Sequence, residues 1–243
     1  MPKTPYYNIN IDILDTPEAI DICREFLRSD YNHLIYFINA HCFNLAQKNE
    51  SYRGVLNSAD IVLNDGIGIS LGAKHAGIVL KENMNGTDFI PGLLELACKE
   101  GKNVYFLGGK EGIASSAKLK AEQKYPELKI SGYRNGYFDI NNDLEVLQDI
   151  IDKKTELLIV GMGVPRQELW LAKNKDRLTG VKISIAGGAI LDFISENVSR
   201  APKLMRKTGT EWVFRLLQEP LRLFKRYAIG IPLFYYYIYK LKK

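Results

Sequence analysis

Short apolar segments alternate with longer segments of helical pattern, and this alternation limits the choice of fold more than any other feature of the chain. Six segments rich in β-branched and aromatic residues are predicted strands: residues 33–38, 60–63, 104–107, 128–133, 157–161 and 182–186. Five segments are predicted helices: residues 17–27, 88–99, 113–124, 142–153 and 166–176. Such alternation is typical of βαβ units. We therefore predict an α/β domain over residues 1–194, with a Rossmann-like, doubly wound and mostly parallel sheet.

Most of the predicted strands run directly into glycines or short polar residues. These junctions are residues 39–41, 64–68, 108–109, 161–165 and 187–188. Ligands of parallel sheets bind at the carboxyl ends of the strands. Glycine lets a ligand approach the backbone closely, and the free amides of a helix N-terminus favour an anion. Several such turns at one edge of the sheet predict a phosphorylated or nucleotide-linked substrate.

The motifs of several common nucleotide-binding proteins are missing. The chain has no G-x-G-x-x-G followed by an acidic residue about 20 positions on, and no G-x-x-x-x-G-K-[ST]. This disfavours a nicotinamide-dependent dehydrogenase and a P-loop ATPase. There is also no D-x-D pair that would hold a divalent ion. We therefore expect no metal and no cofactor, with Arg or Lys neutralising the phosphates.

Cysteines and the N-terminus bear on the compartment. Cys23, Cys42 and Cys98 are too few and too scattered for a disulfide framework or a zinc site. The first residues contain no apolar signal-peptide core. We expect a cytoplasmic protein that meets the inner face of the cell membrane from the cytoplasmic side.

Residues 195–243 form a basic and aromatic segment, which we call the C-terminal appendage. Its part from residue 200 onward carries 11 lysines and arginines against two glutamates, whereas the whole chain has a net charge of only +5. Such an asymmetry predicts an anionic partner. In a helix over residues 210–227, Arg215, Arg222 and Arg226 would form one stripe opposite an apolar face. Pro220 favours a kink or two short helices instead.

Two interpretations of the C-terminal appendage are open. It could lie at a membrane surface with its cations toward lipid phosphates, or it could pack on the core as an ordinary amphipathic helix. The tyrosines at residues 235–239 favour the membrane surface, and the uncharged segment 228–239 is shorter than the ~20 residues needed to span a bilayer. Nucleic acid is disfavoured because the rest of the chain is acidic. The apolar surface also leaves a homo-oligomer open.

The chain resembles the WecG/TagA/CpsF glycosyltransferases over almost its whole length. The resemblance lies in INAHCFNLAQ (38–47), ADIVLNDGIGISLGAK (59–74), NGTDF (85–89), YFLGGKEGIA (105–114), GYRNGYFD (132–139), VGMGVPRQELWL (160–171), IAGGAILDF (185–193) and RAPKLMRKTGTEWVFRLLQEPLRLFKRY (200–227). It implies an inverting enzyme without a metal requirement. The implied partners are a UDP-sugar donor, often of N-acetylmannosamine or its uronic acid, and a polyprenyl-diphosphate-linked acceptor in teichoic acid, enterobacterial antigen or capsule assembly. The alternative is a non-catalytic, membrane-docked protein that binds a nucleotide sugar or acts as a scaffold.

Asp65 is the catalytic residue that the resemblance implies. It follows a predicted strand and precedes glycines that leave its carboxylate accessible, where it could accept a proton from the acceptor hydroxyl. The alternative is a structural turn, because an Asp before Gly is common in turns and caps.

The resemblance and the junction residues together give the candidate substrate-binding residues: Asn39, Gly66, Asn85, Gly86, Asp88, Gly108, Gly109, Gly136, Tyr137, Gly163, Gln167, Glu168, Gly187, Gly188, Asp192, Arg215, Arg222 and Arg226. The side chains of Asn39, Asn85 and Asp88 suit sugar hydroxyls, although Asn85 could be a turn residue and Asp88 a helix cap. Tyr137 could support the uracil or lie buried in the core.

Two positions depart from the family pattern. Phe37 stands where the family usually has Thr, and Asn83 stands where it usually has Arg, with Asn85 in place of the Thr that follows. A donor pocket without that guanidinium needs its positive charge from elsewhere. We therefore expect the C-terminal appendage to fold over the strand ends and to supply an arginine to the diphosphate.

Overall fold

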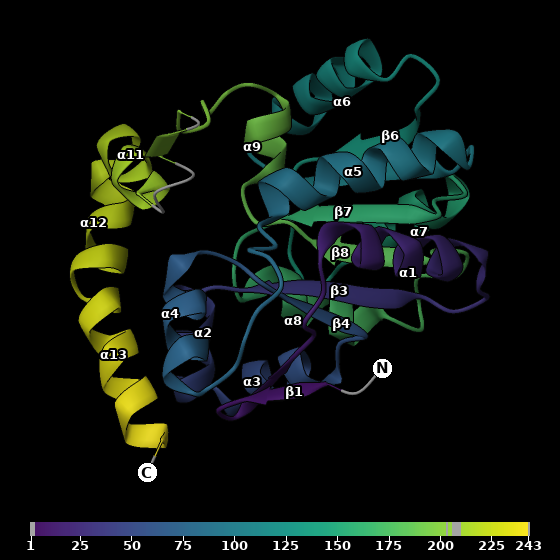
Figure 1. Cartoon of the computed structure of the whole chain (residues 1–243). Helices are drawn as coiled ribbons and strands as arrows, with labels where there is room; N and C mark the ends of the chain where they lie inside the picture. The colour runs from purple at the N-terminus through teal and green to yellow at the C-terminus, as the bar shows by residue number, and fades with distance from the viewer. Residues whose placement is uncertain (1–2, 203, 206–209, 243) are drawn as a thin grey trace.

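A six-stranded, wholly parallel sheet forms the centre of the chain (Figure 1). The computed structural model describes residues 3–202, 204–205 and 210–242. Across the sheet the strands are β4 (Ile61–Asn64), β3 (His33–Ile38), β8 (Ile183–Ala186), β7 (Leu157–Gly161), β5 (Asn103–Gly108) and β6 (Lys129–Arg134). Each overlaps a predicted strand, so the prediction of an α/β fold with a parallel sheet is confirmed.

Both faces of the sheet are buried. In β3, Leu34, Tyr36 and Ile38 belong to one core cluster, and Ile35 and Phe37 belong to the other. A parallel strand covered on both sides reads as a continuous apolar run, because its alternate side chains enter different cores. Phe37 is therefore a core residue that lies edge-to-face against Phe89.

Helices cover the two faces. One face carries α1 (Thr16–Arg28), α5 (Gly86–Lys99), α6 (Ile113–Lys124) and α9 (Ile190–Ile194). The other carries α3 (Glu50–Ser58), α7 (Leu144–Asp152) and α8 (Arg166–Asn174). Five of these helices, α1 and α5 to α8, were predicted from the sequence. The antiparallel pair of β1 (Thr4–Tyr6) and β2 (Ile9–Ile11), which packs near β4 and α3, was not.

Two further helices stand at the carboxyl end of the sheet. They are α2 (Ala40–Lys48), which follows β3, and α4 (Ile67–His75), which follows β4. Asn39 caps the start of α2, and its side-chain oxygen accepts the backbone N–H groups of His41 and Cys42 at 3.1 Å each. This cap satisfies amides that a helix N-terminus leaves free.

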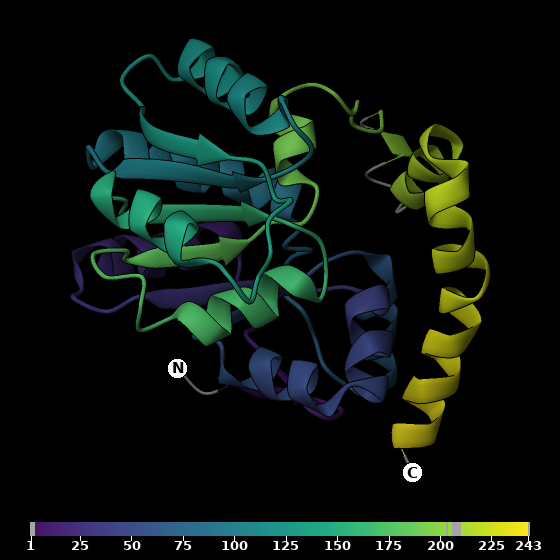
Figure 2. The same ribbon diagram turned by 180° about the vertical axis from the view of Figure 1, so that it is seen from behind.

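The C-terminal appendage forms three helices, α11 (Glu211–Gln218), α12 (Pro220–Ala228) and α13 (Gly230–Leu241). The predicted break at Pro220 is confirmed: α11 ends before Glu219, and Pro220 is the first residue of α12. Proline is tolerated there because the first helical residue needs no N–H partner. Figures 1 and 2 both show these helices, in yellow, standing beside the edge at which the strands end.

The last of these helices is anchored in the core. Phe234 and Ile238 of α13 are buried, and Phe234 lies edge-to-face against Phe43 of α2. The side-chain amide of Asn44 donates a 2.7 Å hydrogen bond to the carbonyl oxygen of Gly230. The C-terminal appendage therefore packs on the core, as one of the two interpretations predicted, through one face of α13. Among the described residues, no helix is long and apolar enough to cross a membrane.

Candidate functional site

Glycine turns interlock at the carboxyl ends of β5, β7 and β8. The N–H of Gly109 donates to the carbonyl oxygen of Gly161 at 3.0 Å, and the N–H of Gly187 donates to Val160 at 2.8 Å. Gly108 has a φ of +148°, and a methyl group there would lie 2.4 Å from the Gly161 oxygen. Only glycine fits such an approach, so these turns keep the strand ends free of side chains.

Asp65 and Asn39 meet at the ends of neighbouring strands. β3 pairs with β4 so that Ile38 lies opposite Asn64, and the side-chain amide of Asn39 therefore reaches Asp65 Oδ2 at 3.3 Å. Burial raises the pKa of the Asp65 carboxyl, while the Asn39 hydrogen bond and the guanidinium groups of Arg226 and Arg215 oppose the rise. The carboxylate has one amide donor and two nearby cations.

Asn83 fixes the turn that follows this carboxylate. Its side-chain oxygen accepts the N–H of Gly66 at 2.7 Å. Gly66 has a φ of +85°, a conformation that favours glycine, and it directly precedes α4, which has no side-chain cap. The residue in place of the family's Arg thus acts on the backbone next to Asp65, a role that the sequence did not indicate.

The residues after Asn83 build the start of α5. Asn85 caps this helix by accepting the N–H of Asp88 at 3.0 Å, and it also bonds the hydroxyl of Thr87. The capping alternative therefore falls to Asn85 and not, as the sequence suggested, to Asp88. Gly86 begins the helix close to the ring of Phe37. Asp88 instead forms an ion pair with Arg200, with Nη1 and Oδ1 2.7 Å apart.

Gln167 and Glu168 are buried in the first turn of α8. The Gln167 amide donates to Glu168 Oε1 at 2.7 Å, and its oxygen accepts the N–H of Gly188 at 3.2 Å. Burial raises the pKa of Glu168 to about 7, and its Oε2 is buried without a hydrogen-bond partner among the described residues. Gln167 thus links α8 to the turn after β8, and Gly163 lies one helical turn earlier, where its carbonyl oxygen accepts the Gln167 N–H.

Tyr137 lies at the far end of the row of glycine turns. Its side chain is 71% exposed and, with Lys110, Glu111 and Asn135, lines a cavity of about 370 Å³. The alternative of a buried core tyrosine is therefore wrong. Gly136 connects this loop to the turns, since its N–H donates to the Gly109 oxygen at 3.0 Å.

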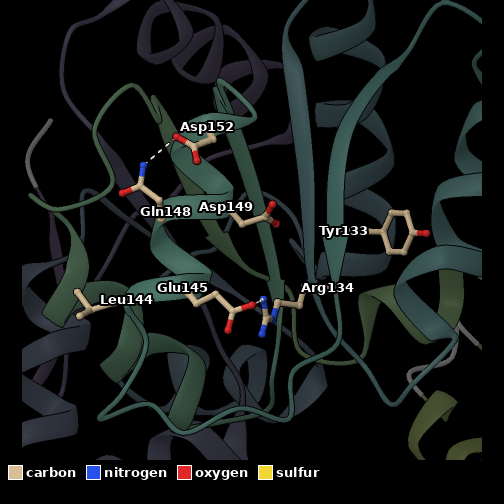
Figure 3. A pocket seen from close by; sticks show the side chains of 7 residues that line it. All are labelled: Tyr133, Arg134, Leu144, Glu145, Gln148, Asp149 and Asp152. Carbon is tan, nitrogen blue, oxygen red and sulfur yellow. Dashed lines mark hydrogen bonds and ion pairs between the residues drawn. The ribbon is translucent and has the colours of Figure 1, made fainter.

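A larger cavity, of about 730 Å³, lies away from these residues, between β6 and α7 (Figure 3). Arg134 and Glu145 point toward one another there and form a 3.0 Å ion pair, whereas Tyr133 points away from the helix. None of the candidate site residues lines it.

The C-terminal appendage brings charge to the strand ends. Arg215 of α11 lies over the ring of Phe193 at 5.4 Å, and its Nε is buried without a partner among the described residues. Arg226 of α12 lies close enough to Asp65 and His41 to affect both: burial and Arg226 lower the pKa of His41 to about 4. The side chain of Arg222, the third predicted arginine, lies outside the described part of the structure.

Two charged residues of this region escaped the sequence analysis. These residues are Arg200 and Glu211. Burial raises the pKa of the Glu211 carboxyl; Arg200 and Arg215 lower this pKa, and Asp65 and Asp88 raise it. The five side chains therefore share one environment. Neither Arg200 nor Glu211 follows a predicted strand, and the candidate site residues were sought mainly at strand ends.

Asp192 of α9 is partly buried, and its backbone oxygen accepts the hydroxyl of Ser195 and the N–H of Val198. Within the described ranges, no group of His, Cys, Asp and Glu is arranged to hold a metal.

Comparison with known proteins gives a consistent result. The model of the glycosyl transferase WecG/TagA/CpsF family matches residues 4–243. A Bacillus subtilis N-acetylglucosaminyldiphosphoundecaprenol N-acetyl-beta-D-mannosaminyltransferase is 30% identical over 94% of this chain and 86% of its own length. Proteins of the same name from Bacillus spizizenii and Staphylococcus aureus are 32% and 26% identical, over 77% and 89% of this chain and 71% and 83% of their own lengths.

Proposed function

The chain belongs to the WecG/TagA/CpsF family of glycosyltransferases, and we propose that it moves an N-acetylmannosamine-type sugar from UDP to a polyprenyl-diphosphate-linked acceptor. The donor and the acceptor come from the names of the relatives and from the chemistry of the strand ends. The observation that carries the proposal is the Asp65 carboxylate, which lies beside an amide donor and two arginines at the edge where the glycine turns meet.

The row of strand ends suits an extended nucleotide sugar. Neighbouring strands lie about 4.8 Å apart, so the four steps from β4 to β5 cover about 19 Å. We place the uracil at Tyr137, the diphosphate over the glycines that follow β5, β7 and β8, and the sugar toward Asn39 and Asp65. These glycine turns keep side chains away from the strand ends, so a phosphate group can approach the backbone closely.

In the proposed reaction, Asp65 acts as the general base. It takes the proton from the acceptor hydroxyl, the freed oxygen attacks the anomeric carbon, and the bond from that carbon to the phosphate oxygen breaks. The electron pair leaves with UDP, and a single displacement inverts the anomeric configuration. Arg215 and Arg226 neutralise the diphosphate that develops charge, so the proposal assigns this role to arginines and needs no metal ion.

The surface of the C-terminal appendage supports docking on a membrane. Leu217, Leu221 and Phe224 are 75%, 99% and 65% exposed. Exposed lysines of α12 and α13, Lys225 and Lys240, lie on the same appendage. An apolar surface flanked by cations suits the anionic inner face of a cell membrane, where a lipid-linked acceptor would lie.

The test uses purified protein with a panel of UDP-sugars and a short-chain polyprenyl-diphosphate N-acetylglucosamine acceptor. Asp65→Asn is expected to lower the rate by ~10²–10⁴-fold while UDP binding is kept, because only the base is lost. Because the pKa of Asp65 is raised, the wild-type enzyme should lose activity on acidification at a higher pH than an enzyme whose base is an ordinary aspartate. If Asp65→Asn supports full polymer synthesis in cells, the non-catalytic binding or scaffold protein is favoured instead.

A further inference from the structure

Arg200 holds an unused pair of donors at the candidate site. Its Nη1 donates to Asp88 Oδ1 at 2.7 Å, whereas its Nε and Nη2 are buried and have no hydrogen-bond partner among the described residues. The N–H groups of Nε and Nη2 lie on the same edge of the planar guanidinium and point in the same direction. This free edge is a fork of two parallel donors, fixed from the other side by Asp88.

A fork of this kind matches one class of ligand. Two parallel N–H donors fit two oxygens of a single phosphate or carboxylate group, and such bidentate pairs are among the stronger hydrogen bonds in proteins. Buried donors without partners are unfavourable, so a ligand that supplies both oxygens would be bound with a gain in free energy.

The charges around Arg200 favour a phosphate over a carboxylate as the ligand. Arg215 presents a second buried donor without a partner among the described residues, its Nε, and both arginines act on the carboxyl of Glu211. Arg226 and Arg215 act in turn on Asp65. Two cations beside the proposed base and a third, Arg200, beside the neighbouring Glu211 suit a diphosphate, which carries more negative charge than a carboxylate.

We propose that Arg200 is a diphosphate-binding residue, whose Nε and Nη2 donate to two oxygens of one phosphate while Asp88 holds Nη1. The inference rests on the proposed function and adds to it a residue outside the predicted arginine stripe. Asp88 is then an orienting residue for Arg200, not a partner of the sugar hydroxyls. The donor and the lipid-linked acceptor both carry a diphosphate, and the experiment below separates them.

The experiment compares Arg200→Lys with Arg134→Lys by titration calorimetry with UDP and with farnesyl diphosphate. Lysine keeps the charge but removes the fork, so the substitution isolates the two parallel donors. Arg134 is a matched control, because its Nη1 also donates to one carboxylate, Glu145, and its exposure is similar. We expect Arg200→Lys to weaken one ligand by about tenfold or more, as for the loss of one charged hydrogen bond.

The pattern of losses identifies the diphosphate. Weaker UDP binding assigns Arg200 to the donor, and weaker farnesyl diphosphate binding assigns it to the acceptor. Wild-type affinity for both ligands in Arg200→Lys would overturn the inference and leave the proposed function standing. A wild-type protein that binds neither ligand would overturn both.

A second measurement avoids any effect of the substitution on folding. In the wild-type protein, the Arg200 Nε–H resonance, assigned by its loss in Arg200→Lys, is expected to move downfield when the bound ligand is added. This shift reports a shorter, charge-assisted hydrogen bond. An unchanged resonance at saturating ligand would contradict direct binding through the fork.

Discussion

At the scale of single residues, three asparagines around Asp65 act through the same group, the side-chain oxygen. The side-chain oxygens of Asn39, Asn83 and Asn85 each accept a backbone N–H, at the start of α2, at Gly66 and at the start of α5. Asn and Asp are favoured at such positions because their short side chains reach the free amides of a helix start. These contacts fix the backbone around Asp65 before any substrate binds.

Asn83 is therefore expected to position the base. Asn83→Ala removes the acceptor for Gly66 N–H and should lower kcat by ~5–10-fold, the effect of about 1 kcal/mol, with little change in KM for the donor. Asn83→Asp keeps the acceptor and should recover most of the rate. Steady-state kinetics with both substrates checks this expectation. A rise in KM with unchanged kcat would instead indicate that Asn83 contacts the donor.

Glu168 makes folding stability depend on pH. Burial raises its pKa from the ordinary value of 4.5 to about 7 in the folded chain, so folding favours the protonated form. The stabilisation is complete below the unfolded pKa and is lost as the pH rises through about 7. Glu168→Gln, which cannot ionise, should become more stable than the wild type by up to about 3 kcal/mol between pH 5 and pH 8.

Urea unfolding at a series of pH values measures this difference. The comparison removes the contributions of all other titrating groups, because they are common to both proteins. A constant difference between the two proteins across this range would contradict the prediction, because it would mean that Glu168 is ionised in the folded as well as in the unfolded state.

At the scale of elements, α4 and α13 pack closely through a glycine. A methyl group at Gly72 of α4 would lie 2.0 Å from Tyr6 Oη and 3.1 Å from Phe234 Cζ. Gly72 thus lets α4 meet both the strand β1 and the buried aromatic face of α13. The contact joins the N-terminal strands, the helix after Asp65 and the C-terminal appendage.

Gly72→Ala is expected to destabilise the fold by ~1–3 kcal/mol through overpacking, despite the higher helix propensity of alanine. Gly54→Ala in α3 is the matched control, since nothing lies within 4 Å of a methyl group there. That substitution should stabilise the chain by about 0.5–1 kcal/mol. Thermal unfolding of both variants tests the prediction, and two stabilised variants would show that Tyr6 and Phe234 can move aside.

At the scale of the whole molecule, the C-terminal appendage has a buried surface that packs on the core and an exposed apolar surface. Phe234 and Ile238 face the core, whereas Leu221 and Phe224 face away from it. The arginines of α11 and α12 lie near Asp65 while the exposed apolar residues lie on the same two helices. A membrane under α11 and α12 would therefore also bring a lipid-linked acceptor to the proposed base.

The double substitution Leu221→Glu and Phe224→Glu should weaken binding to phosphatidylglycerol vesicles by at least about tenfold. Each exposed apolar side chain contributes ~1.5–3 kcal/mol when it enters an apolar phase, and each glutamate adds repulsion from anionic lipid. Leu119→Glu, at an exposed position of α6, is the control. Vesicle sedimentation measures binding. Unchanged binding, together with loss of a dimer in light scattering, would assign this surface to a second copy of the chain.

The sequence alone predicted most of the sheet. β3, β5 and β7 are apolar on both faces, so six β-rich segments separated by helical patterns specify a parallel sheet. Helices α2 and α4 were not predicted, because their sequence patterns are weak. Only one residue, the cap Asn39, separates α2 from its strand, and α4 contains the helix-disfavouring Gly68 and Gly72. The β1–β2 pair escaped because strands of three residues carry almost no periodicity.

The candidate site divides in the same way. Asn39 and Asp65 were predictable neighbours, because each directly follows a strand and the ends of adjacent parallel strands meet at one edge. Arg200 was not predictable, since its partner Asp88 is 112 residues away and no local pattern connects them. Local periodicity and turn chemistry were enough to predict the six strands of the sheet, five of its helices and the polar residues at the strand ends. Which charges meet at that edge depends on long-range packing, because docking of α13 on α2 and α4 places the arginines of α11 and α12 beside Asp65.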